Sequence, residues 1–146
     1  LWALDRRTSE RLLDDLKKRN LYDDSLIVLV SDHGEEFLEH GNFEHMKTIY
    51  DEVIRVPLMI KLPRQRQGQV VRGRFPLIDL YPSLLAYLRI DGRALGLQGD
   101  AVPLNGLLRS ADKPIFSSTT PNVKCVINGD YKYIETNRHA PVMAPP

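Results

Sequence analysis

The sequence predicts an α/β fold followed by a small antiparallel sheet, and three observations lead to this prediction. A helical pattern in the first 20 residues precedes a continuous apolar run, Leu26–Val30, as a helix precedes a strand in an α/β unit. A second apolar run, Val56–Ile60, predicts another buried strand. Near the C-terminus, Asn128-Gly129-Asp130 separates two strand-like stretches, which is typical of a hairpin.

The composition is that of an ordinary soluble globular domain. Twenty Lys and Arg residues against 19 Asp and Glu residues leave a net charge of +1 over 146 residues. This balance argues against a nucleic-acid footprint or a polybasic membrane patch. No apolar run reaches the ~20 residues needed to cross a bilayer. The single Cys125 excludes an internal disulfide and a multi-cysteine zinc site, and it leaves the redox compartment open.

The first element is predicted to be an amphipathic helix that ends near Asn20. Lys17, Lys18 and Arg19 lie in its last turn, where cations suit the helix dipole. Asn20 readily adopts the left-handed conformation that ends a helix. The strand that follows, Leu26–Val30, shows no alternation and is therefore expected to be covered on both faces.

The middle of the chain predicts short elements joined by loops. One or two helical turns are expected over Thr48–Ile54, and Pro57 suits an edge strand or a first strand position. The segment Pro63–Gly73 is expected to be an exposed loop or hairpin. A helix with a core-facing apolar stripe is predicted after Asp79, its plausible N-cap.

The last third predicts a long connection and then a sheet. Residues 91–113 form the connection, with a short helix near residues 104–108. Three strands are expected, and the tail from Asn137 is expected to be mobile. The strands are Ile115–Ser118, Val123–Ile127 and Tyr131–Glu135.

The residues that suggest chemistry follow the first strand directly. Asp32 and His33 stand at its carboxyl end, where ligands bind in open α/β sheets. Successive strand residues point to opposite faces, so the two can share a ligand only if the backbone leaves strand geometry, a turn that Gly34 would permit. An oxygen donor beside an imidazole forms half of a metal site. The alternative is a structural polar turn.

The next dozen residues hold more titratable groups than a structural loop needs. These are Glu35, Glu36, Glu39, His40, His45 and Lys47. The three glutamates also fit a solvated acidic loop, whereas His40 and His45 are the better candidates for an active site.

Two motifs carry a resemblance to a known family. Val30–Gly41 reads Val-Ser-Asp-His-Gly-Glu-Glu-Phe-Leu-Glu-His-Gly, and Lys47–Ile60 reads Lys-Thr-Ile-Tyr-Asp-Glu-Val-Ile-Arg-Val-Pro-Leu-Met-Ile. In this order and at this separation they resemble the C-terminal part of sulfatases in the alkaline phosphatase superfamily. Weaker similarity extends to the first helix, to Ile78–Leu85 and to Gly129–Ile134, and so covers most of the chain.

The resemblance implies a division of the chain. Residues 1–63 would be the C-terminal part of an alkaline-phosphatase-like α/β/α core, and 64–113 a helix with connecting loops. Residues 114–136 would be the small antiparallel sheet, and 137–146 the mobile tail.

The resemblance also implies roles for residues. Such enzymes hold one divalent cation between two N-terminal aspartates, a nucleophile and an Asp-Asn or Asp-His pair, which Asp32 and His33 match. Ca²⁺, Mn²⁺, Zn²⁺ and Mg²⁺ are all candidates, and the histidine donor favours Mn²⁺ or Zn²⁺. Lys47 matches the anion-binding lysine, with a surface lysine as the alternative because Met46-Lys47-Thr48 lacks the common glycine. His40 and His45 match histidines near the active site.

Two expected features of the family are missing. The formylglycine nucleophile arises in a Cys-x-Pro-x-Arg motif or its Ser form, whereas Val-Ile-Asn-Gly follows Cys125. The N-terminal pair of aspartates is also missing. We therefore expect a C-terminal fragment of a sulfatase that hydrolyses small sulfate esters, is inactive alone and self-associates. The alternatives are a phosphodiesterase or phosphonate monoester hydrolase of the same superfamily, or a noncatalytic truncated module.

Overall fold

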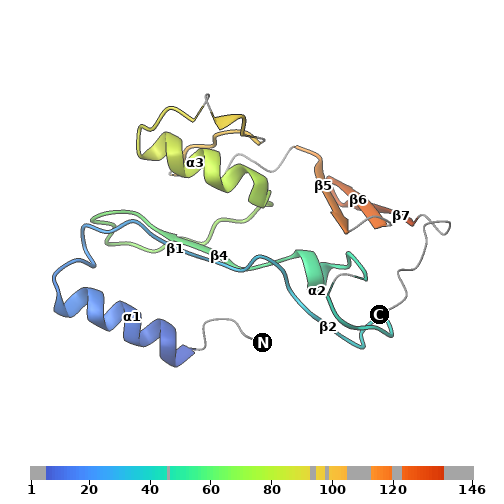
Figure 1. Ribbon diagram of the computed structural model, residues 1–146, viewed down its shortest axis with the longest axis horizontal. Coiled ribbons are helices and arrows are strands. Elements are labelled where there is room, and N and C mark those ends of the chain that lie inside the picture. The colour runs from blue at the N-terminus through green and yellow to red at the C-terminus, as the bar shows by residue number, and fades with distance from the viewer. Residues whose placement is uncertain are drawn as a thin grey trace. The chain divides into compact units, whose positions relative to one another are not determined.

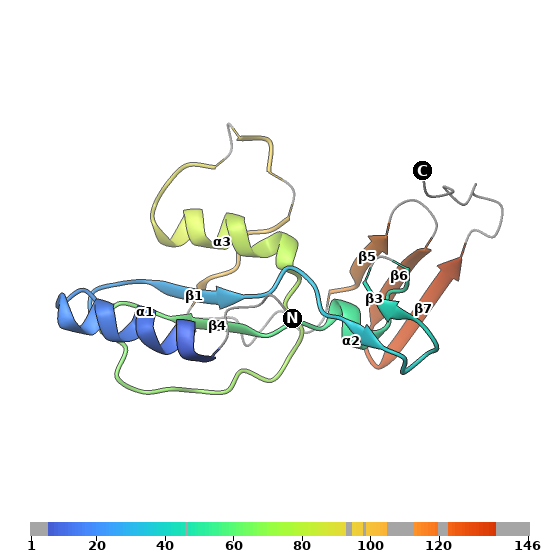
Figure 2. The same cartoon turned by 60° about the horizontal axis from the view of Figure 1, so that its bottom comes forward.

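The chain forms two compact units in a computed structural model. The structure describes residues 6–45, 47–92, 95–97, 99–104, 113–119 and 123–136. The units are Leu1–Gly68 and Gln69–Pro146. Their elements can be followed from blue to red in Figure 1 and, after a rotation, in Figure 2.

The first unit begins with the predicted amphipathic helix. Helix α1 spans Arg6–Lys18, with Lys17 and Lys18 in its last turn. Asn20 has a φ of 56°, so the left-handed stop after the helix is confirmed. Residues 1–5, which the prediction included, lie outside the described residues.

The two apolar runs form a two-stranded antiparallel sheet. Strand β1 (Ile27–Val30) pairs with β4 (Leu58–Lys61), with a register that runs from Ile27 opposite Lys61 to Val30 opposite Leu58. The two strands lie side by side in Figures 1 and 2. Pro57 immediately precedes β4, which confirms its expected place at the start of a strand.

The expectation that the first strand is covered on both faces is wrong within the described residues. Val30 is 38% exposed and Met59 is 56% exposed. Antiparallel pairs tolerate a solvated face, and no further described strand pairs with β1 or β4. Leu26–Val30 therefore has the composition of a buried strand but only one neighbouring strand here.

A hairpin and one helical turn lie between these two strands. Strand β2 (Glu36–Phe37) pairs with β3 (Phe43–Glu44), in a segment where the sequence predicted only a loop. Helix α2 (Asp51–Ile54) falls within the predicted helical segment. Ile49 and Val53 are buried and anchor this segment in the core of the first unit.

The second unit begins with a loop and a helix. The segment Pro63–Gly73 is a loop that crosses the boundary between the units. A 3₁₀ turn, η1 (Leu77–Asp79), leads into α3 (Leu80–Tyr87). The predicted apolar stripe is buried at Leu85 but exposed at Leu88, so only part of it packs in the core.

Asp79 has a different role from the predicted helix cap. It occupies the N-cap position in a right-handed helical conformation, and its side chain makes no capping hydrogen bond. Its buried Oδ1 accepts the N–H of Asp100 at 2.7 Å instead. The carboxylate therefore holds the following connection against the helix.

The C-terminal sheet matches the prediction closely. Its strands, in the order β5-β6-β7, are all antiparallel. The predicted hairpin is confirmed, but Asn128 belongs to β6 and pairs with Tyr131, so the turn consists of two residues, and Gly129 in it has a φ of 54°. The bounds are β5 (Ile115–Thr119), β6 (Val123–Asn128) and β7 (Tyr131–Thr136).

Two remaining predictions concern segments that are not fully described. Residues 105–108 of the predicted short helix and the tail from residue 137 lie outside the described residues. Among the described helices, none is both long and apolar enough to cross a bilayer.

Candidate functional site

The backbone turns away from strand geometry directly after β1. The Ser31 hydroxyl donates to the carbonyl oxygen of His33 at 2.7 Å, and the Gly34 N–H donates to the Val53 carbonyl oxygen at 2.7 Å. The turn expected at this position is therefore present, and it is bonded to α2.

Gly34 is required for close packing and not for a left-handed turn. A Cβ atom at this position would lie 1.9 Å from the carbonyl oxygen of Glu52. Such a distance is far inside van der Waals contact. The absence of a side chain at Gly34 thus lets the turn lie directly on α2.

Asp32 and His33 can present an oxygen and a nitrogen to the same ion. Asp32 Oδ1 lies 3.8 Å from His33 Nε2 and also accepts the His33 backbone N–H at 3.0 Å. Bonds of about 2.1 Å from one cation can span this separation. The Asp32 side chain is 89% exposed, so its carboxylate is open to an incoming ion.

The hydrogen bond made by Nδ1 of His33 sets the tautomer of this histidine. His33 Nδ1 lies 2.9 Å from the Gly34 carbonyl oxygen, which can only accept. The proton is therefore assigned to Nδ1, and Nε2 keeps its lone pair beside Asp32. Donor type and donor geometry both fit half of a divalent cation site.

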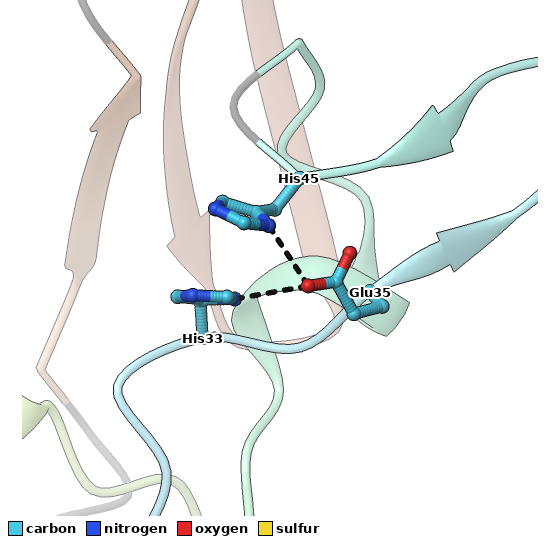
Figure 3. Close-up of side chains that lie close together, drawn as sticks. All are labelled: His33, Glu35 and His45. Carbon is cyan, nitrogen blue, oxygen red and sulfur yellow. Dashed lines mark hydrogen bonds and ion pairs between the residues drawn. The ribbon is translucent and has the colours of Figure 1, made fainter. Parts of the chain in front are cut away.

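A second feature of the site is the His–Glu–His cluster, formed by His33, Glu35 and His45 (Figure 3). Glu35 Oε1 lies 2.8 Å from His45 Nδ1 and 3.7 Å from His33 Nδ1. The two imidazole rings stack with centroids 3.8 Å apart and planes at 25°. One carboxylate therefore faces the Nδ1 atoms of both rings.

The His–Glu–His cluster has the donors of a transition-metal site but not its geometry. The lone pair of an imidazole nitrogen lies in the ring plane, and a bound ion sits about 2.1 Å away in that plane. Two planes that are 3.8 Å apart at the centroids and inclined by 25° do not meet at such a short distance. A shared ion would require His33 and His45 to unstack.

A buried carboxylate supports the opposite side of the hairpin. Glu36 is fully buried. Its Oε1 accepts the backbone N–H groups of His40 and Asn42, each at 3.2 Å, and its Oε2 accepts the Thr48 hydroxyl at 2.6 Å. Glu36 therefore joins β2 to the hairpin turn and to the segment before α2.

His40 is fixed beside this carboxylate by its own ring contacts. Its Nδ1 lies 2.6 Å from Glu52 Oε1, and its ring stacks on Tyr50 with centroids 3.7 Å apart. Glu36, His40 and Glu52 bring three donor atoms close together. Because the oxygens of Glu36 already accept three hydrogen bonds, we interpret Glu36 as a structural residue and not as a metal ligand.

The stability of the chain is expected to fall in acid because Glu36 becomes protonated. The hydrogen bond from Thr48 is the main cause that lowers the pKa of Glu36 from 4.5, with burial acting in the opposite direction. The carboxyl group is then more acidic in the folded chain than in the unfolded one. Its stabilising contribution is complete above about pH 4.5 and is lost as the pH falls through the lowered pKa.

Urea unfolding between about pH 7 and pH 3 measures this effect. The free energy of unfolding of the Glu36→Gln variant should depend less on pH than that of the wild type. Glu39→Gln is the matched control, because Glu39 lies on the exposed hairpin turn and accepts only the Phe37 N–H among the described residues. A Glu36→Gln curve parallel to that of the wild type contradicts the assignment.

The structure brings Asp32, His33 and His45 together, whereas His40 lies in a separate group with Glu36 and Glu52, and Lys47 lies in neither group. Asp32 lies beside His33, and His45 stacks on His33. Lys47 is exposed and makes no hydrogen bond or ion pair with another described residue. Its predicted contact with an anion stays a prediction.

Sequence reasoning missed the roles of Glu35 and Glu36, which it treated as parts of a solvated loop. Both are held in place by hydrogen bonds within the first unit. The sequence offers only a weak signal of the hairpin, namely Gly41 and Asn42 between Phe37 and Phe43.

With the fold and the site in place, comparison with protein families gives one clear result. The sulfatase family matches residues 9–90, more than half of the chain. The chain belongs to the sulfatase family.

Individual relatives are similar to only part of this chain. Arylsulfatase K of Gallus gallus is 34% identical over 79 residues, which cover 54% of this chain and 15% of that protein. The multifunctional alkaline phosphatase superfamily protein PehA of Trinickia caryophylli is 35% identical over 96 residues, or 58% of this chain and 18% of that protein. The chain thus spans less than a fifth of the length of these relatives.

A solved structure shows the same fold. The phosphonate monoester hydrolase of Silicibacter pomeroyi superposes with a TM-score of 0.66 at 21% identity. The match covers 91% of this chain and 32% of that hydrolase. The chain therefore shares the mixed α/β fold of part of that larger structure.

Proposed function

We propose that this chain supplies the Asp-His half of a divalent cation site in an enzyme that hydrolyses sulfate esters. The supporting observation is the pair Asp32 Oδ1 and His33 Nε2, 3.8 Å apart, with the His33 proton held on Nδ1 by Gly34. When bound, Ca²⁺, Mn²⁺, Zn²⁺ or Mg²⁺ would polarise the oxygens of the ester. The remaining ligands and the formylglycine nucleophile would come from residues outside this sequence.

In this proposal, three further residues contact the ester. The contact of His45 is supported by its stacking on the candidate cation ligand His33, with ring centroids 3.8 Å apart. His40 is held at the edge of the same hairpin by Glu52. The exposed Lys47 is free to move its ammonium group to the anion.

A second candidate function is hydrolysis of phosphodiesters or phosphonate monoesters. The cation and its two ligands would polarise a phosphoryl oxygen as readily as a sulfuryl oxygen. The similarity to PehA, a multifunctional member of the alkaline phosphatase superfamily, supports this second candidate function. The nucleophile would distinguish the two functions, and its identity is not encoded in these residues.

The cation proposal predicts that Mn²⁺ binds at Asp32 and His33 in this chain. Because only two donors are present, we expect an affinity on the order of millimolar. Paramagnetic broadening of backbone amide signals in NMR spectra detects such weak binding. The broadening should centre on residues 32–34 and should fall about tenfold or more in Asp32→Asn and in His33→Ala.

The matched control is Asp14→Asn, which removes an exposed carboxylate on α1. This variant should keep the wild-type pattern of broadening. Broadening that centres elsewhere, or that persists in both site variants, contradicts the proposal. We also expect negligible turnover of an aryl sulfate by the chain alone, since the nucleophile is absent. Turnover that Asp32→Ala abolishes would contradict the expected need for further residues.

A further inference from the structure

We propose that Glu35 is a positioning residue that holds the proton of His45 on Nδ1 and reinforces the tautomer that the Gly34 carbonyl sets on His33, so that each ring presents an unprotonated Nε2 to the site. On His33 that nitrogen is the cation donor, and on His45 it is a proton acceptor for the ester reaction. The roles given to the two Nε2 atoms, cation donor on His33 and proton acceptor on His45, rest on the proposed function. The positioning itself rests on geometry within this chain.

The first step of the argument is the hydrogen bond of His45. Its Nδ1 lies 2.8 Å from Glu35 Oε1. An ionised carboxylate only accepts hydrogen bonds, so the proton of a neutral His45 ring must be on Nδ1. No other described residue accepts a hydrogen bond from this nitrogen. Within the described part of the chain, Glu35 is therefore the residue that selects the tautomer of His45.

The second step is the effect of the same oxygen on His33. Glu35 Oε1 lies 3.7 Å from His33 Nδ1, whose proton is already directed to Gly34. A carboxylate at this distance stabilises the N–H dipole electrostatically without a direct hydrogen bond. Gly34 and Glu35 thus favour the same tautomer of His33.

The third step is the coupling of the two rings. Their centroids are 3.8 Å apart, so His45 cannot rotate freely without displacing His33. Figure 3 shows both rings facing the carboxylate of Glu35. A single side chain therefore fixes the tautomer of one ring and, through the stack, the orientation of both.

The backbone explains why Glu35 occupies this place. In the β2–β3 hairpin, Glu36 lies opposite Glu44 and Phe37 lies opposite Phe43. Continuing this register by one residue places Glu35 opposite His45, which agrees with their contact. The hairpin, which the sequence did not predict, is thus the element that assembles the His–Glu–His cluster.

The alternative use of these residues is a transition-metal site that includes His45. The stacked rings argue against it, because no ion can lie in both ring planes at bonding distance in this arrangement. The positioning role needs no rearrangement of the side chains. It is therefore the interpretation that the geometry favours.

The test is the tautomeric state of each histidine, measured on the full chain labelled with ¹⁵N-histidine. Long-range ¹H–¹⁵N spectra are recorded with a chelator at about pH 8.5, where imidazoles of ordinary pKa are neutral. The wild type should show a protonated Nδ1 on both His33 and His45. In Glu35→Met, which has no acceptor oxygen at this position, His45 should lose the protonated Nδ1 signal.

Two further variants separate positioning from a general structural role. Glu35→Gln keeps a carbonyl oxygen and should retain the Nδ1 proton of His45. Glu39→Met removes a neighbouring carboxylate that bonds only the Phe37 N–H among the described residues, and it should leave both histidines unchanged. Persistence of the Nδ1 proton in a folded Glu35→Met variant overturns the proposal.

The wild-type spectrum is a readout that does not depend on the folding of any variant. A His45 ring protonated on Nε2 overturns the proposal by itself. A ring protonated on Nδ1 in the wild type and in Glu35→Gln supports it even if Glu35→Met does not fold. Because no cation or ester is added, a failed cation experiment leaves this result unaffected, and the two proposals can fail separately.

Discussion

Replacement of Gly34 by alanine is expected to destabilise the first unit by about 2 to 4 kcal/mol. The added Cβ would lie 1.9 Å from the Glu52 carbonyl oxygen and 3.0 Å from its carbonyl carbon. Both are backbone atoms of α2, so no side-chain rotation can relieve the clash. The turn must then move away from α2, and the hydrogen bond from the Gly34 N–H to Val53 is lost.

This displacement should also affect the candidate site. The turn carries His33 and Glu35, whereas Glu52 of α2 holds His40. If the turn separates from α2, we expect weaker contacts both between Glu35 and His45 and between Glu52 and His40. Urea unfolding measures the loss of stability, and the histidine spectra measure the loss of ordered ring environments.

Two other glycines provide matched controls for this prediction. Nothing lies within 4 Å of a Cβ at Gly68, and its φ is not left-handed, so Gly68→Ala should leave the stability nearly unchanged. Gly41 has equal space but a φ of 84°, so Gly41→Ala should cost about 1 kcal/mol through backbone strain. Equal stability of Gly34→Ala and Gly68→Ala would contradict the packing argument.

The contrast among these glycines shows what the sequence could predict. Gly129 follows an asparagine between two β-rich runs, and this local signal correctly predicted the hairpin. Gly34 also marked a turn, but its reason is an approach to Glu52, 18 positions away. Local turn chemistry can be deduced from neighbouring residues, whereas a close tertiary contact cannot.

The same distinction explains the candidate site. Asp32 and His33 were identified because they are adjacent and follow a strand, and the structure places their donor atoms 3.8 Å apart. The role of Glu35 depends on its alignment with His45 across a hairpin of two-residue strands. Strands this short give too little alternation to predict their pairing. The burial of Glu36 was missed for a related reason. A glutamate is rarely buried unless it has hydrogen-bond partners, and the partners of Glu36 are only visible in the folded chain.

The strand pair shows a different limit of the sequence. The continuous apolar run in β1 indicated cover on both faces, yet the described chain leaves Val30 partly exposed. A continuous apolar run shows that a strand could be buried on both faces, but it does not show that this chain covers both faces.

Replacement of Lys61 by methionine is expected to destabilise the chain by about 2 to 3 kcal/mol. Lys61 Nζ lies within hydrogen-bond distance of four carbonyl oxygens in the first unit. They belong to Tyr22 at 2.6 Å, Asp23 at 3.1 Å, Ser25 at 3.1 Å and Leu62 at 3.3 Å. The ammonium group has three protons, so it can satisfy three of these oxygens at a time.

The location of Lys61 explains why one ammonium group should have such a large effect. It is the last residue of β4, and three of the four residues it bonds, Tyr22, Asp23 and Ser25, lie in the connection between α1 and β1. Nζ also lies 4.6 Å from the centroid of the Tyr22 ring, a distance suited to a cation–π contact. Methionine keeps the apolar stem but leaves these carbonyl groups without their cationic donor, so this connection should loosen from β4.

Lys17→Met is the control for the loss of a positive charge near the same tyrosine. Lys17 Nζ lies 5.5 Å from the Tyr22 ring centroid, and its other partner is the exposed Asp14 carboxylate. An exposed pair of this kind contributes only about 0.5 kcal/mol. Urea unfolding should therefore separate the two variants clearly. If Lys61→Met is no less stable than Lys17→Met, the carbonyl groups around Lys61 do not depend on its ammonium group, and solvent satisfies them equally well.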